Sequence, residues 1–234
     1  LIKVCDSRKI IMAENKLTVA YWGIQGLVHP VRMILAYHKV QFEDKQYMDR
    51  PEWFETDKPK LNTPLKSLPY IVDGDVTLTE SYALMQYAAL KTGNKDLLGK
   101  NDLDAITVSQ YYSVGKDIAN AIGALAWNKD FETVKDETIK TKIAPLVEKL
   151  SKALGEKEYM LGYLTWVDFQ LTYLFEIVKR LSPETVTAHA NLVKYHDRIY
   201  NHENLQAYRK SEKYPKFYLP PVPGVQWSGE EKLQ

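Results

Sequence analysis

The most informative stretch of this 234-residue chain is Leu68-Pro69-Tyr70-Ile71-Val72-Asp73-Gly74-Asp75-Val76-Thr77-Leu78. Two short apolar runs joined by an Asp-Gly pair predict a β-hairpin. Directly after it, Glu80 and Ser81 open a segment with apolar residues at helical spacing, which predicts a helix. The expected order here is therefore β-β-α.

Upstream of the hairpin, the pattern predicts a β-α-β unit. Residues Leu17-Thr18-Val19-Ala20-Tyr21 alternate large apolar and small side chains, as a strand does. A helix is expected to begin at His29-Pro30, because proline is tolerated in a first turn. A second strand is expected over residues 41–48. The intervening residues 49–66 carry three prolines and little periodicity.

Downstream of the hairpin and its helix, the pattern is helical throughout. Helices are expected over residues 102–127, 131–154, 167–181 and 188–200, followed by an extended tail from the proline-rich Tyr218 to Pro223. The predicted organisation is a mixed α/β domain at 16–93, a linker at 94–101, and a helical domain with its tail at 102–234. Residues 1–15 are expected to be a non-native or disordered extension, with Met12 as the natural start.

Composition excludes several classes of function. Lys+Arg 31 against Asp+Glu 30 gives a net charge of +1, so nothing points to nucleic acid or an anionic membrane as partner. No apolar run approaches the ~20 residues that span a bilayer. One cysteine, Cys5, excludes a disulfide framework and a cysteine zinc site, and the histidines lack ligand spacing, so no metal is expected. The start lacks signal-peptide features, and cytoplasm is the default compartment.

Two features next to the predicted hairpin could hold a peptide-like ligand. If the Leu68–Pro69 bond is cis, the preceding backbone can offer its N–H and C=O to a ligand, although only about 5–6% of such bonds are cis. The helix start at Glu80-Ser81 can bind a carboxylate through its N–H groups and the Ser81 hydroxyl, while Glu80 takes an ammonium group. The same pair also fits an ordinary helix cap with a dipole-compatible glutamate.

A third feature is Tyr21, at the end of the first strand. A tyrosine hydroxyl there can donate a hydrogen bond to a thiolate, worth about 1.5–3 kcal/mol. That is enough to lower a thiol pKa of ~8.5 by one or two units. Taken alone, a tyrosine at this position is more often a packing aromatic.

These features in this order resemble a cytosolic glutathione transferase. The resemblance rests on Tyr21-Trp22-Gly23-Ile24-Gln25-Gly26-Leu27, on residues 68–74 and on Glu80-Ser81, and it extends from Leu17 to Trp227. It implies a thioredoxin-like domain of order β-α-β-α-β-β-α followed by an all-helical domain. It further implies a homodimer that binds glutathione and small hydrophobic electrophiles, with no cofactor beyond the co-substrate glutathione.

The class features are mixed. The Tyr-Trp pair and residues 127–131 resemble the mu class, whereas the short segment from Phe42 to Trp53 resembles the sigma class. The mu dimer uses an aromatic key shortly before the Leu-Pro motif, and Leu65 holds that position here. The chain is therefore described as mu/sigma-like.

The resemblance also implies roles for individual residues. Tyr21 is the expected thiol activator, and Lys60 competes with Lys58 for one contact with glutathione. Asp117 is expected to reach glutathione in the neighbouring subunit, and Glu80 stands where most relatives have glutamine. The expected glutathione contacts are Tyr21, Trp22, Leu27, Arg50, Trp53, Lys58, Ser67, Leu68, Pro69, Glu80, Ser81 and Asp117.

The acceptor pocket is expected between the domains, at Ile24, Lys116, Asn120, Gly123 and Trp127. The mu class often has a tyrosine hydroxyl where Trp127 stands, and an indole N–H cannot act as an acid. Epoxide opening is therefore expected to be weak.

The segment Thr165-Trp166-Val167-Asp168 matches a capping box that begins a buried helix in this family, so its expected role is in folding. The expected reaction is addition of glutathione thiolate to an electrophile. Absence of a cysteine at the Tyr21 position argues against thiol–disulfide exchange. Two alternatives stay open: a glutathione-dependent isomerase, and a non-enzymatic structural protein or hydrophobic-ligand carrier.

Overall fold

Four strands form one mixed sheet in the computed structural model, which describes residues 16–231. The strands are β1 (Thr18–Trp22), β2 (Glu43–Tyr47), β3 (Tyr70–Asp73) and β4 (Val76–Thr79), in the spatial order β2-β1-β3-β4. β1 pairs parallel with β2 and antiparallel with β3, and β3 pairs antiparallel with β4. The expectations for residues 1–15 lie outside the described residues.

The hairpin predicted at the Asp-Gly pair is present. Asp73 and Val76 are paired, so the connecting residues are Gly74 and Asp75, and Gly74 has a φ of 60°. Glycine adopts this left-handed conformation without the steric cost of a Cβ. The Leu68–Pro69 bond that precedes β3 is cis, contrary to the expectation from the frequency of such bonds alone.

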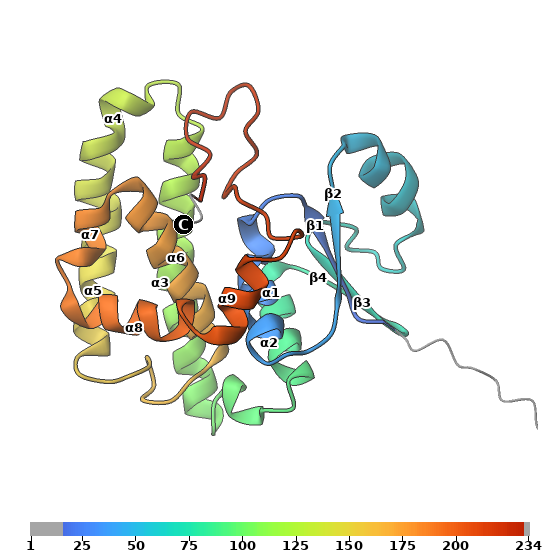
Figure 1. The fold of residues 1–234 in the computed structure, drawn as a ribbon, viewed down its shortest axis with the longest axis horizontal. Helices are drawn as coiled ribbons and strands as arrows, with labels where there is room; N and C mark the ends of the chain where they lie inside the picture. The colour runs from blue at the N-terminus through green and yellow to red at the C-terminus, as the bar shows by residue number, and fades with distance from the viewer. Residues whose placement is uncertain (1–15, 232–234) are drawn as a thin grey trace, which may run out of the picture.

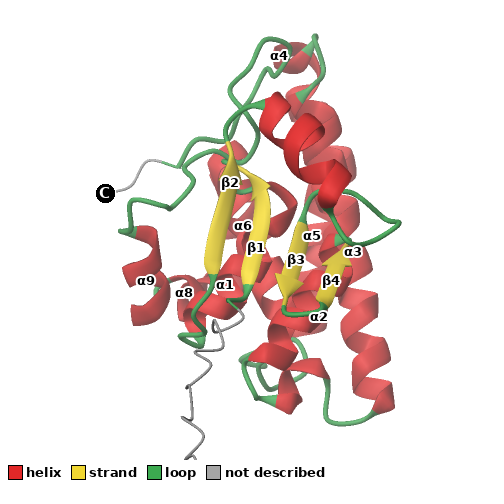
Figure 2. Ribbon diagram, turned by 90° about the vertical axis from the view of Figure 1, so that its right-hand side faces the viewer, coloured by secondary structure: helices red, strands yellow, loops and turns green. Residues whose placement is uncertain are grey.

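Two α-helices cover one face of the sheet. Helices α1 (His29–Tyr37) and α2 (Ser81–Lys91) pack together behind the sheet as it is seen in Figure 2. The expected thioredoxin-like order has a second α-helix between β2 and β3. The structure instead has a π-helix, η2 (Glu52–Asp57), followed by a 3-10 helix, η3 (Lys58–Lys60). Pro59 has no N–H and cannot extend an α-helix through this segment.

The chain after the sheet is helical, as predicted. The long helix over 102–127 is confirmed, whereas the helix expected over 131–154 is interrupted by a π-helical segment just before Pro145. The remaining elements are η1 (Gly26–Val28), η4 (Lys95–Leu98), α3 (Asp102–Ala126), α4 (Phe131–Thr138), η5 (Ile139–Ile143), α5 (Ala144–Leu154), α6 (Trp166–Leu181), α7 (Pro183–Thr187), α8 (Ala190–Tyr200) and α9 (Glu203–Arg209). Among these, the sequence pattern missed the short 3-10 helices η1 and η4 and the short α-helices α7 and α9.

Helix α6 lies in the middle of the molecule, among the other helices of the C-terminal half (Figure 1). Its capping box is formed as predicted, with Asp168 accepting from the backbone N–H of Thr165 at 2.7 Å. The Asp168 carboxylate also accepts from the N–H of Met160 and the Tyr195 hydroxyl, at 3.0 and 2.8 Å. Since α6 contacts both α1 and α3, it joins the sheet layer to the helical layer.

The last described segment, residues 214–231, is here called the strap. It leaves α9 and returns to the loop between β1 and α1, where the N–H groups of Gln25 and Gly26 donate to the carbonyls of Phe217 and Tyr218 at 2.7 and 3.1 Å. Farther along, the N–H of Gln226 donates to the carbonyl of Ala126 at 2.8 Å. The tail predicted to be extended therefore connects the sheet half with the end of α3 (Figure 1).

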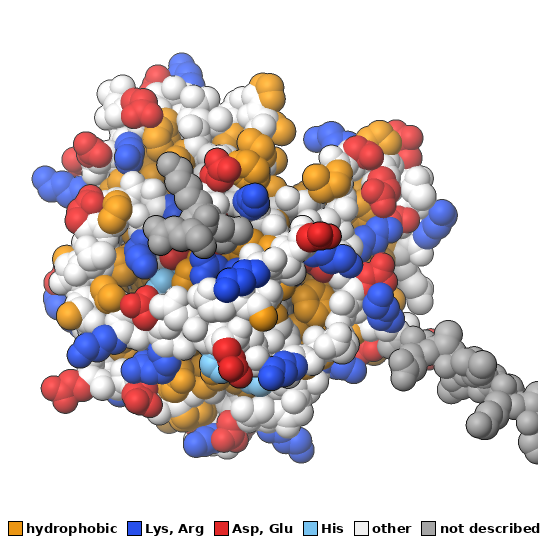
Figure 3. Space-filling view, in the orientation of Figure 1, with side chains coloured by type: hydrophobic (Ala, Val, Ile, Leu, Met, Phe, Trp, Pro, Cys, Tyr) orange, Lys and Arg blue, Asp and Glu red, His pale blue; other side chains and the backbone are white. Residues whose placement is uncertain are grey.

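Within residues 16–231, no helix is both long and apolar enough to cross a membrane. On the face of the molecule shown in Figure 3, acidic and basic side chains are interspersed with apolar ones.

Candidate functional site

A cavity of about 570 Å³ lies where α2, α3, α6, the β1–α1 loop and the strap meet. Its walls mix aromatic, apolar and uncharged polar side chains with one lysine and one glutamate. The lining residues are Gly26, Leu27, Pro30, Glu80, Ser81, Tyr82, Met85, Ser109, Tyr112, Ser113, Lys116, Ala119, Asn120, Gln170, Tyr173, Leu174 and Tyr218.

One end of the cavity is the N-terminus of α2. Glu80 is the N-cap residue with a φ of 69°, and both Glu80 and Ser81 line the cavity. The Ser67 hydroxyl donates to Glu80 Oε1 at 3.2 Å, so the residues before the cis peptide bond lie beside the helix start. The helix dipole and the free N–H groups of the first turn favour an anion here. The helix start at Glu80-Ser81 and the segment that leads into Leu68–Pro69, two of the three features predicted from the sequence, therefore lie next to each other.

Tyr21 lies directly behind the wall formed by Gly26 and Leu27. Its side chain is 8% exposed and does not line the cavity. A Cβ at Gly26 would lie 2.6 Å from Tyr21 Cε1 and 3.1 Å from the hydroxyl, and Gly26 has a φ of 47°. Burial raises the pKa of the Tyr21 hydroxyl, while the backbone N–H of Leu27 and the Arg32 guanidinium oppose that rise. The phenol therefore stays protonated at neutral pH and can donate.

The structure separates the residues expected to bind the acceptor. Lys116 and Asn120, one helical turn apart on α3, line the cavity. Ile24 is in the core at 7% exposure, and neither Gly123 nor Trp127 lines the cavity. Trp127 is 50% exposed at the end of α3, next to the strap.

Several of the residues expected to contact glutathione lie around Phe54 on η2. The Trp22 and Phe54 ring centroids are 6.2 Å apart, and the Arg50 guanidinium and the Lys58 amino group lie 5.0 and 5.4 Å from the Phe54 ring. Trp53, by contrast, is 3% exposed and stacks on Tyr70 in a small core on this side of the sheet. The cavity is not lined by Trp22, Arg50, Trp53, Phe54 or Lys58. Asp117 does not line it either and is exposed on α3.

Sequence reasoning missed most of the aromatic wall. Ser109, Tyr112, Ser113 and Lys116 recur at helical spacing on α3, and this periodicity was the available signal for a cavity-facing stripe. Tyr218 lines the cavity because the strap packs against the β1–α1 loop, and no local sequence pattern predicts that contact. Among residues 16–231, no group of three or more His, Cys, Asp or Glu side chains is arranged to hold a metal ion.

Comparison with known proteins agrees with this architecture. The family model described as "Glutathione S-transferase, N-terminal domain" matches residues 17–90, and "Glutathione S-transferase, C-terminal domain" matches residues 116–212. A glutathione S-transferase of Tyrophagus putrescentiae is 31% identical over 226 residues, covering 93% of this chain and 99% of the relative. Human glutathione S-transferase Mu 4 is 29% identical over 206 residues, covering 85% of this chain and 92% of the relative.

Solved structures give the same result. The glutathione S-transferase from Ascaris lumbricoides superposes with a TM-score of 0.69 at 26% identity, covering 85% of this chain and 100% of that chain. The Pi-class enzyme of Onchocerca volvulus shares the fold, with a TM-score of 0.76 at 22% identity over 90% of this chain and 100% of that chain. The thioredoxin-like and helical halves, the order of the two family models and the extent of these similarities show that the chain belongs to the glutathione S-transferase family.

Proposed function

We propose that this glutathione transferase binds reduced glutathione at the α2 end of the cavity and that Tyr21 activates its thiol. The observation that carries this proposal is the position of Glu80 and Ser81 at that end, with Tyr21 behind the adjacent wall. Ser67, which directly precedes Leu68–Pro69, is hydrogen-bonded to Glu80. The substrate is a thiol tripeptide with a carboxylate and an ammonium group at one end. Each of these groups has a matching partner in the cavity.

Binding follows from the charges at the start of α2. The α-carboxylate of the γ-glutamyl residue sits at the N–H groups of the first turn and the Ser81 hydroxyl, and the ammonium group pairs with Glu80. The cysteinyl backbone pairs antiparallel with Leu68, ahead of the cis-proline. This orientation directs the thiol to the wall of Gly26 and Leu27, next to the Tyr21 hydroxyl.

The chemical step is addition of the thiolate to the acceptor. A hydrogen bond from Tyr21 to the sulfur, worth about 1.5–3 kcal/mol, lowers the thiol pKa from ~8.5 by about one to two units. The thiolate then forms a bond to the electrophilic carbon, and a leaving group departs or a proton from water completes the addition. Tyr82, Tyr112, Tyr173 and Tyr218 line the rest of the cavity and favour flat, apolar acceptors.

A homodimer is part of this proposal. Large apolar side chains are exposed in the loop before β3, on β4, near the end of α2 and at the start of α3. They are Leu65, Val76, Leu90, Leu103 and Ile106, at 64%, 39%, 54%, 70% and 66%. Such a face favours a second copy of the chain, which would bring Asp117 to its neighbour's glutathione. Sedimentation of the wild type and of Leu103→Glu tests this, and a monomeric wild type would refute it.

We also propose a cytoplasmic location, because cytosolic conditions keep the thiol of glutathione reduced. The domain division at 16–93 and 102–234 is proposed as well. Limited proteolysis between residues 94 and 101 would test the division, and cell fractionation the location.

The decisive experiment is conjugation of 1-chloro-2,4-dinitrobenzene by the wild type, Tyr21→Phe and Tyr159→Phe. Tyr159 lies outside the cavity and serves as the matched control. The expected result at pH 6.5 is a fall of about 10- to 100-fold for Tyr21→Phe alone, with glutathione affinity nearly unchanged. Full turnover by Tyr21→Phe would assign thiol activation to another donor.

A further inference from the structure

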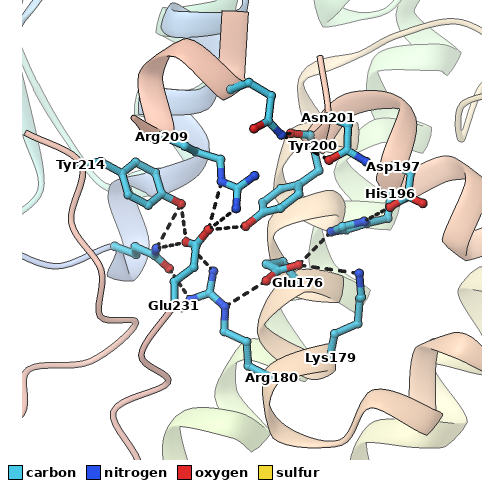
Figure 4. Close-up of polar contacts among 12 residues, drawn as sticks. Glu176, Lys179, Arg180, His196, Asp197, Tyr200, Asn201, Arg209, Tyr214 and Glu231 are labelled. Carbon is cyan, nitrogen blue, oxygen red and sulfur yellow. Dashed lines mark hydrogen bonds and ion pairs between the residues drawn. The ribbon is translucent and has the colours of Figure 1, made fainter. Parts of the chain in front are cut away.

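Glu231, at the end of the strap, is the centre of a buried polar cluster (Figure 4). The side chain of this residue is 3% exposed. Its carboxylate accepts hydrogen bonds from five side chains that come from α6, α8, α9, the β1–α1 loop and the strap itself. The donors are Arg180 at 2.7 Å, Tyr200 at 2.6 Å, Arg209 at 2.6 Å, Gln25 at 2.9 Å and Tyr214 at 2.5 Å.

The charges of this cluster are balanced. Two guanidinium groups, of Arg180 and Arg209, face the Glu231 carboxylate, and Arg180 Nε also pairs with Glu176 Oε1 at 3.1 Å. Glu176 Oε2 lies 3.1 Å from His196 Nε2. A buried carboxylate is stable only when it is paired and hydrogen-bonded in this way. Because every partner of Glu231 is a donor, an amide in its place would set an N–H₂ against other donors.

Gln25 connects this cluster to the β1–α1 loop. Its side-chain Nε2 donates to Glu231 Oε2 and to the Pro215 carbonyl, both at 2.9 Å, and its Oε1 accepts from Arg180 Nη1 at 3.0 Å. Its backbone N–H donates to Phe217 O, and the next N–H, of Gly26, donates to Tyr218 O. Gln25 is fully buried, so the loop is held to the strap through both backbone and side chain.

The residues that follow Gln25 form the wall in front of Tyr21. Gly26 contacts the Tyr21 ring, and Gly26 and Leu27 line the cavity together with Tyr218 of the strap. The titratable groups close enough to affect Tyr21 are Arg32, Tyr173 and Tyr218. A shift of the strap would therefore move the loop amide and one of these hydroxyl groups relative to the Tyr21 oxygen.

We propose that Glu231 and Gln25 are positioning residues for thiol activation: by holding the strap on the β1–α1 loop, they fix Gly26, Leu27 and Tyr218 around the Tyr21 hydroxyl. The inference rests on the proposed role of Tyr21. Neither side chain lines the cavity, so neither contacts glutathione or the acceptor there. Their effect is on the geometry of the hydrogen bond that Tyr21 donates to sulfur.

The test is the pH midpoint of thiolate formation by bound glutathione, followed by ultraviolet absorbance in wild type, Glu231→Gln and Glu230→Gln. Glu230 is the exposed neighbour and serves as the matched control. For Glu231→Gln, loss of part of a charge-assisted hydrogen bond is expected to raise the midpoint by about one pH unit. Conjugation at pH 6.5 is then expected to fall about tenfold, with the glutathione Kd changed less than about threefold.

A second variant tests the same inference in case Glu231→Gln does not fold. Gln25→Met keeps the approximate volume of the side chain and removes its side-chain hydrogen bonds to Glu231 and Pro215 of the strap. Glu231 keeps both arginines and both tyrosines. Its midpoint is expected to rise in the same direction. A midpoint equal to that of the wild type in the folded variants overturns the inference, even if both variants are less stable.

Tyr21→Phe separates this inference from the proposed function. If Tyr21→Phe keeps the wild-type midpoint, the role of Tyr21 fails and the positioning inference fails with it. If Tyr21→Phe raises the midpoint and both strap variants leave it unchanged, only the positioning inference fails.

Discussion

Replacement of Gly26 by alanine would disturb the wall in front of Tyr21 in two separable ways. Gly26 has a φ of 47°, a left-handed conformation that an alanine adopts only with strain. The added Cβ would lie 2.6 Å from Tyr21 Cε1, well inside van der Waals contact. That atom belongs to the ring of a buried side chain, so it cannot move aside freely.

The magnitude follows from these two effects. A left-handed conformation costs a residue with a side chain roughly 1–2 kcal/mol. An overpacked contact in a buried site costs about 1–3 kcal/mol more. The expected loss is therefore about 2–5 kcal/mol out of a total stability of about 5–15 kcal/mol. Relief of the contact by a movement of the Tyr21 ring would also lower conjugation.

The assay compares the free energy of unfolding in urea for Gly26→Ala and Gly93→Ala. Gly93 has a φ of 77°, but an added Cβ there meets no atom within 4 Å. Gly93→Ala therefore reports the backbone strain alone, and the difference between the two variants reports the contact with Tyr21. Conjugation of 1-chloro-2,4-dinitrobenzene is expected to fall only in Gly26→Ala.

Equal losses of stability in the two variants, with full activity in Gly26→Ala, would refute this reasoning. The Tyr21 ring would then not lie against Gly26, and the wall described above would be wrong.

Three further predictions concern Glu80, Asp168 and Glu231. Glu80→Ala is expected to weaken glutathione binding about tenfold through loss of the ammonium pair, whereas exposed Glu55→Ala leaves it unchanged in calorimetric titrations. Asp168→Asn sets an amide N–H₂ against buried donors and is expected to cost about 1–3 kcal/mol in urea unfolding; an unchanged midpoint would exclude the capping box as a stabilising element. Burial opposes ionisation of Glu231, but Arg180 and its other partners lower its pKa from 4.5 to about 2. Its contribution, about 3 kcal/mol, is complete above pH 4.5 and is lost as pH falls toward 2, so Glu231→Gln should show a flatter stability profile in that window than the wild type.

Local patterns were sufficient for the elements whose signals are short in sequence. The Asp-Gly pair predicted the hairpin, and the capping residues at Thr165 and Asp168 predicted the start of α6. The helix expected over 131–154 was wrong in its middle, because apolar periodicity does not register the change of winding at η5. The cis bond at Leu68–Pro69 was likewise outside what residue frequencies indicate.

In the candidate site, too, local sequence predicted some features and not others. Glu80 and Ser81 are neighbours in the chain, so a helix start alone brings their groups together. The order of Tyr21, the Leu-Pro pair and Glu80-Ser81 identified the family without any knowledge of contacts. These properties depend on interactions within a few residues, which the order of side chains determines directly.

The contacts that complete the site depend on packing between distant segments. Gln25 and Glu231 are 206 positions apart, yet they share one hydrogen bond, and Tyr218 reaches the cavity only because the strap returns to the β1–α1 loop. The placement of Lys116 and Asn120 in the cavity, and of Trp127 outside it, follows from how α3 packs on its neighbours. Burial and charge pairing at this range are properties of the folded chain as a whole, because a carboxylate such as Glu231 is stable in the interior only where separate elements bring its donors together.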